Sequence, residues 1–139
     1  MATISTSGLD DLIPDLAALA AIPDSVIDAM LTAQADVIEP EQKRVMKIMW
    51  TGRYHTGATA EAVRRTKIKS GKDGRHLSIY PQGKNSDGNP NAEVAFINEF
   101  GKRNQPGRPA IDTANQNKAE TAFSGAETVY NAFVKSKNL

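Results

Sequence analysis

The sequence predicts a single α+β domain spanning residues 1–139, with helices toward both ends and a small antiparallel sheet between them. Three observations predict this class. Apolar residues recur at helical spacing in two long stretches, a period of two appears over residues 64–83, and glycines and prolines separate these stretches. The 40% hydrophobic and 24% charged residues are typical of a folded globular chain of this length.

The N-terminal region begins with a flexible Ser/Thr-rich leader, residues 1–8, followed by a helical region over residues 9–50. Asp10 or Asp11 can cap a first short helix, which Pro23 ends. The apolar run within it is too short to span a bilayer, so no membrane partner is expected.

A second helix is expected to start at Asp24. Pro40 removes a backbone donor and crowds the preceding turn, so it should end or kink this helix near Ile38, with helix resuming at Glu41. The side chains expected to face inward are Ile27, Met30, Leu31, Gln34, Val37, Ile38, Val45, Ile48 and Met49.

Residues 64–83 predict a β-hairpin, preceded by a short helical turn over residues 56–63. The segment from Gly71 to Gly74 supplies the loop, because glycine adopts the positive φ that tight connections need. Strict alternation would pack the apolar side chains Ile68, Leu77 and Ile79 together. The same alternation leaves the cationic side chains Arg65, Lys67 and Lys69 outward.

Residues 91–101 predict a short helix, with Asn91 as N-cap, Glu93 in the first turn and Gly101 at the stop. A strand is the alternative, because the apolar side chains of Val94, Phe96 and Phe100 share one parity. The start and stop signals favour the helix.

A long C-terminal helix over residues 109–135 is expected to pack on the hairpin. Pro109 suits its first position and Asp112 its first turn. Its apolar arc is wider than one packing partner requires, which predicts a second partner such as another subunit. Gly125 predicts a tight contact or a bend. The arc comprises Ile111, Ala114, Ala119, Ala122, Phe123, Ala126, Val129, Tyr130, Phe133 and Val134.

Charge is distributed unevenly although the net charge is only +1. Residues 1–42 carry eight acidic groups and no Lys or Arg, whereas residues 43–84 carry eleven basic groups against two acidic ones. These thirds can attract each other within one chain, or between copies in a head-to-tail contact.

Motifs for chemistry are missing from the sequence. There is no cysteine, and His55 and His76 lie in unrelated contexts, so we expect no catalytic, metal or cofactor site and no enzyme activity. The basic hairpin is the one chemical candidate, because its cations can contact nucleic-acid phosphates. We favour instead a solvated strand face, or a face that meets the acidic region of another copy. These cations are Arg65, Lys67, Lys69, Lys72 and Arg75.

The stretch from Ala95 to Gly101, followed by the stretch from Pro106 to Ala114, resembles the signature of the tailed-bacteriophage minor tail component family. Its members are called tail-completion, tail-terminator or head–tail joining proteins. The shared pattern is an alanine, apolar positions, Glu-aromatic-Gly, a short basic loop, and Arg-Pro before a C-terminal helix. The order of elements covers residues 24–135.

This resemblance implies a structural virion protein that forms a ring, typically a hexamer, where the tail tube meets the capsid connector. The expected partners are copies of itself and the neighbouring connector, stopper and tail-tube proteins, with DNA passing through the lumen without specific binding. Assembly would take place in the cytoplasm of the host bacterium. By analogy, the residues that position the C-terminal helix are Glu99, Phe100, Gly101, Arg108 and Pro109. Glu99 can pair with Arg103 or Arg108, and the sequence does not choose between them.

Overall fold

A computed structural model describes residues 21–51 and 57–137. The leader, the first short helix and His55 lie outside these residues. The described chain is an α+β fold, as the sequence predicted. Its helices are α2 (Asp24–Met49), α3 (Ala58–Glu61), α4 (Asn91–Phe100) and α5 (Ala110–Ser136). Its strands are β1 (Val63–Arg65), β2 (Lys69–Gly71), β3 (Gly74–His76), β4 (Ile79–Pro81), β5 (Gly101–Lys102) and β6 (Gln105–Pro106).

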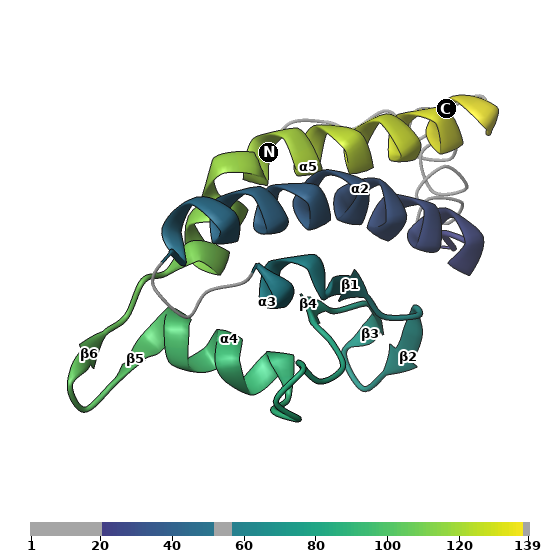
Figure 1. Ribbon diagram of the computed structural model, residues 1–139. Coiled ribbons are helices and arrows are strands. Elements are labelled where there is room, and N and C mark those ends of the chain that lie inside the picture. The colour runs from purple at the N-terminus through teal and green to yellow at the C-terminus, as the bar shows by residue number, and fades with distance from the viewer. Residues whose placement is uncertain (1–20, 52–56, 138–139) are drawn as a thin grey trace, which may run out of the picture.

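The long helices α2 and α5 lie side by side and run in opposite directions, and the shorter elements gather beneath them (Figure 1). The C-terminal helix therefore packs on α2 and not on the hairpin as expected. Small side chains allow the two helices to approach: Ala35 of α2 and Ala114, Ala122 and Ala126 of α5 are all buried.

Helix α2 passes through Pro40 without ending, so of the two expected effects of Pro40, an end or a kink, the end is wrong. Pro40 and Asp36, whose carbonyl would have accepted the missing hydrogen bond, are both exposed. Water can therefore solvate that carbonyl, and packing against α5 holds the two halves as one helix.

The inward face of α2 differs from the prediction near its C-terminal end. Val45 and Met46 are buried, whereas Ile48 is 60% exposed. Trp50, just beyond the helix, is 4% exposed and completes a core that joins both layers. The core cluster consists of Val45, Met46, Trp50, Ala60, Val63, Ala95, Ala110 and Ala114.

The predicted hairpin is present, with a break in its register. Strand β2 pairs with β3 around the turn from Gly71 to Gly74, and β1 pairs with β4 farther along. Residues 66–68 face residues 77–78 between these pairs, so the first strand carries one extra residue, a β-bulge. As a result Arg65 pairs directly with Ile79 on one face, which corrects the predicted separation of cations from apolar side chains.

Residues 91–100 are helical, which settles the choice between helix and strand. Gly101 is the C-cap, as expected, with φ 83°. Asn91 is not the N-cap: Pro90 takes that position, and the Asn91 side chain donates a hydrogen bond to the Gln82 carbonyl. The start of α4 is thereby fixed to the end of the β4 segment.

Candidate functional site

Glu99, in the last turn of α4, caps a different helix. Its side chain is buried, and the carboxylate accepts hydrogen bonds from the N–H groups of Ile111 (2.8 Å) and Asp112 (2.9 Å). These N–H groups belong to the first turn of α5, where they have no intrahelical partner. Pro109, at the N-cap, supplies no side-chain cap. Glu99 therefore takes over capping, with its negative charge at the positive end of the helix dipole.

Arg108 binds the end of the other long helix. Its Nη1 donates hydrogen bonds to the carbonyls of Met49 (3.0 Å) and Thr51 (2.9 Å), where α2 leaves carbonyl groups without intrahelical partners. The Arg108 carbonyl accepts a hydrogen bond from Nε1–H of Trp50 at 2.7 Å. Its N–H donates to the Asn98 carbonyl at 2.7 Å. Arg108 thus joins the end of α2 to α4 just before α5 begins.

The partner of Glu99 is neither of the two expected arginines, Arg103 and Arg108. Within the described residues no ion pair joins Glu99 to Arg103 or to Arg108. Glu99 binds backbone N–H groups and Arg108 binds backbone carbonyls, so each charge lies at the end of a different helix.

Between these two residues the chain forms a projecting hairpin, residues 101–107, which we call the arm (Figure 1). Two glycines close its base. A Cβ at Gly101 would lie 2.5 Å from the Gln105 carbonyl oxygen, and a Cβ at Gly107 would lie 2.6 Å from the Glu99 carbonyl oxygen. Only glycine fits at either position, so the base of the arm is held backbone to backbone.

Phe100 faces outward. It is 70% exposed, and its ring centroid lies 4.9 Å from that of Phe96, which is 63% exposed. The pair borders an apolar groove of about 510 Å³ that Tyr80 and Ile111 also line. An exposed aromatic pair of this kind is typical of an interaction surface.

The motif residues therefore divide into two groups. Glu99, Gly101, Arg108 and Pro109 meet where α4, the arm and α5 join. Phe100 lies on the surface beside them. The structure places the exposed aromatic pair next to the residues that fix its position.

Arg65 and Arg75 of the basic hairpin bind α2. Arg65 forms ion pairs with Asp36 and Glu39, both at 2.7 Å. Arg75 donates a hydrogen bond to Asp28 at 2.8 Å, and this bond holds the pKa of the Asp28 carboxyl below its ordinary value. Part of the attraction between the acidic and basic thirds of the sequence is thus satisfied within one chain.

The three lysines of the same hairpin remain exposed. Lys67, Lys69 and Lys72 have no ion-pair partner within the part of the chain that the structure describes. The candidate phosphate-binding patch is therefore reduced to three cations around one turn. The ring on the neighbouring strand, His76, pairs in register with Lys69 and is exposed, and in the described part of the chain no aromatic or cation–π contact involves these lysines.

Metal and membrane sites are not found in the described residues. Residues 21–51 and 57–137 contain no group of three His, Asp or Glu side chains that could hold a metal ion. Within the same residues, no helix is both long and apolar enough to cross a membrane.

Sequence reasoning did not identify Trp50, Asn98 or Gly107 as parts of this junction. Two signals were present: Trp50 is the single tryptophan and directly precedes the Thr51-Gly52 break, and Gly107 precedes the Arg-Pro pair. Neither signal names a partner, because the contacts join segments distant in the chain. Comparison with protein-family models, curated proteins and solved structures gives no match for this chain.

Proposed function

We propose that this chain is a structural virion protein of a tailed bacteriophage, a subunit of a ring at the head–tail junction that terminates the tail tube and joins it to the capsid connector. The observation that carries the proposal is the Glu-Phe-Gly motif. Its glutamate and glycine fix the junction, while its phenylalanine, paired with Phe96, faces solvent.

An exposed aromatic pair is costly in a monomer and useful in an assembly. Burying a phenylalanine side chain contributes about 1.5–3 kcal/mol, so the pair favours a partner. Phe123 on α5 is a further exposed apolar side chain. Its exposure fits the prediction that the apolar face of this helix is wider than one packing partner requires. Two separate contact surfaces suit a subunit that touches neighbours on both sides.

The mass of the assembled protein tests this proposal. The full chain at high concentration should show multiples of 15.0 kDa in native mass spectrometry, and closed rings in negative-stain images. Phe96→Ser with Phe100→Ser should shift the protein toward monomer. Ile48→Ser is the matched control, because Ile48 is a similarly exposed apolar side chain at a different place. A chain that stays monomeric at millimolar concentration, and also fails to bind isolated phage tails or capsids, would overturn the proposal.

Nucleic-acid binding through residues 64–75 is the alternative function. It has weaker support, because two of the five candidate cations, Arg65 and Arg75, are engaged with α2 and only the three lysines of that set remain available. A ring through which DNA passes does not need a specific DNA-binding site. The salt dependence of the affinity for DNA therefore distinguishes the two functions.

A further inference from the structure

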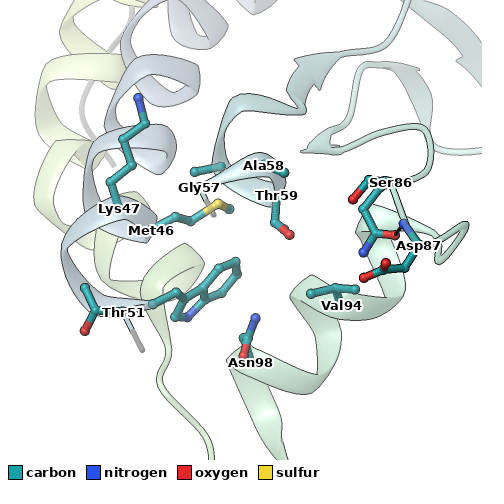
Figure 2. A pocket seen from close by; sticks show the side chains of 13 residues that line it. Met46, Lys47, Thr51, Gly57, Ala58, Thr59, Ser86, Asp87, Val94 and Asn98 are labelled. Atoms are coloured by element: carbon teal, nitrogen blue, oxygen red, sulfur yellow. Dashed lines mark hydrogen bonds between the residues drawn. The ribbon is translucent and has the colours of Figure 1, made fainter. Parts of the chain in front are cut away.

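A pocket of about 450 Å³ lies where α2, α3 and α4 converge (Figure 2). The C-terminal end of α2 forms one wall, and the segment between β4 and α4 forms the opposite rim. It is lined by Met46, Lys47, Trp50, Thr51, Gly57, Ala58, Thr59, Ala60, Asn85, Ser86, Asp87, Val94 and Asn98. None of these residues belongs to the groove beside Phe100.

Two buried polar side chains reach into this pocket without a partner. Asn98 is 5% exposed and Thr59 is 9% exposed, and Figure 2 shows both pointing into the open space. Within the described chain, neither the Asn98 amide nor the Thr59 hydroxyl makes a hydrogen bond. The polar atoms of both side chains are open to the pocket and are not among the fully buried ones that lack a partner, so they are free to bind a ligand that brings its own donors and acceptors.

The charges at the rim indicate a cationic ligand. Lys47 forms an ion pair with Glu61, so its charge is compensated. Asp87 is exposed and has no ion-pair partner among the described residues. A guanidinium or ammonium group would pair with this carboxylate and donate to the oxygens of Asn98 and Thr59, and the Trp50 side chain suits the flat guanidinium best.

The arm of the same protein carries such groups. Lys102 and Arg103 are exposed, and neither has an ion-pair partner in the described chain. The arm projects from the body (Figure 1), and its tip stands roughly 10 Å from its base at about 3.3 Å per residue. The close backbone contacts at Gly101 and Gly107 hold this projection in place.

We infer that the pocket receives Arg103 from the arm of a second copy, with the guanidinium beside Asp87 and Asn98. In its own chain the arm points away from the body (Figure 1), whereas Asn98 points into the pocket between α2, α3 and α4 (Figure 2), so the arm does not fill the pocket of its own chain. Arm and pocket are different surfaces, so every copy donates one and offers the other. A contact of this type closes into a ring or extends as a filament. The inference rests on the proposed ring function and names its subunit contact.

Directed cross-linking tests the contact in a cysteine-free chain. Asn104→Cys at the arm tip and Ser86→Cys at the pocket rim, made in separate chains and mixed under oxidising conditions, should give a disulfide-linked dimer as the main product. Lys67→Cys mixed with Ser86→Cys is the control and should give at least tenfold less dimer. Equal cross-linking in both mixtures would overturn the inference.

Charge exchange supplies the second test. Arg103→Glu and Asp87→Lys should each weaken self-association by about tenfold or more, and the two together should recover most of the loss. Lys67→Glu and Glu93→Lys, which change exposed charges elsewhere, are the matched controls and should have little effect. Rings that persist unchanged in Arg103→Glu would refute this contact while leaving the proposed function intact. The absence of any assembly by the unsubstituted chain would count against both.

Occupancy of the pocket can be followed directly, because Trp50 is the only tryptophan. A cyclised peptide with the sequence of residues 101–107 should change the fluorescence of Trp50 in a saturable way. Asp87→Lys should abolish the change, and the same peptide with glutamate for arginine should not produce it. Saturable binding of free arginine but not of the peptide would assign the pocket to a small ligand and contradict docking of the arm.

Discussion

Glu99 and Arg108 stand on either side of the arm and bind the ends of the two longest helices. Glu99 accepts hydrogen bonds from N–H groups at the start of α5, and Arg108 donates to carbonyls at the end of α2. The helix ends that meet here carry opposite partial charges, and each receives a side chain of the complementary sign. The arm is thus anchored on both helices at once.

Removing the cap should destabilise the fold. Glu99→Ala leaves two N–H groups of a buried helix end without a partner, and loss of a cap costs about 0.5–2 kcal/mol. Urea denaturation of the full chain measures the free energy of unfolding. Glu93→Ala, an exposed acid on the same helix, is the control. Equal effects of the two substitutions would show that Glu99 does not act as a cap.

The base of the arm should reject any side chain. Gly101→Ala combines φ +83° with a Cβ placed 2.5 Å from a backbone oxygen, and strain of this kind costs about 1–3 kcal/mol or more. Gly88→Ala shares a similar φ, +81°, but no atom lies within 4 Å of the added Cβ. The difference between the two variants in denaturation midpoint isolates the steric part. A smaller loss for Gly101→Ala than for Gly88→Ala would contradict the close approach.

Gly125→Ala should stabilise the protein. The added Cβ would lie 3.7 Å from Ala33 of α2, an ordinary van der Waals distance, so the site has room for it. Alanine in place of glycine within a helix is worth about 1 kcal/mol. The melting temperature should therefore rise. A fall would mean that α2 and α5 approach more closely here than the structure places them.

Acid should weaken the attachment of the hairpin to α2. The hydrogen bond from Arg75 lowers the pKa of Asp28 below its ordinary 3.8, so the contribution of this pair is fully present above that pH. It is lost as the pH falls through the lowered pKa, because the protonated carboxyl no longer pairs. Unfolding free energies measured between pH 5 and pH 2 should fall more steeply for the unsubstituted chain than for Arg75→Gln. Parallel curves would exclude the linkage.

DNA binding, if present, should be weak and carried by the lysines. Neutralising three cations changes the slope of log K against log salt by at most about 2.7 for duplex DNA. Lys67→Gln, Lys69→Gln and Lys72→Gln combined should therefore remove most of the salt dependence of any measured affinity. A much steeper slope that persists in this triple variant would point to another basic surface.

The sequence by itself determined the local elements. The 3.6-residue period and Pro109 predicted α5 to within about one residue of each end, and the glycines at 71 and 74 predicted the hairpin turn. Gly101 marked the end of α4 correctly. Each of these features depends on backbone preferences within a few residues, which the sequence states directly.

Only the tertiary structure decided which surfaces meet. It placed α5 on α2, carried α2 through Pro40, paired Glu99 with backbone N–H groups of α5, and turned Phe100 to the solvent. A period shows that a face is apolar but does not say what covers it. The choice of partner depends on packing and hydrogen bonding summed over segments that lie far apart in the chain, and no short stretch of sequence contains that sum.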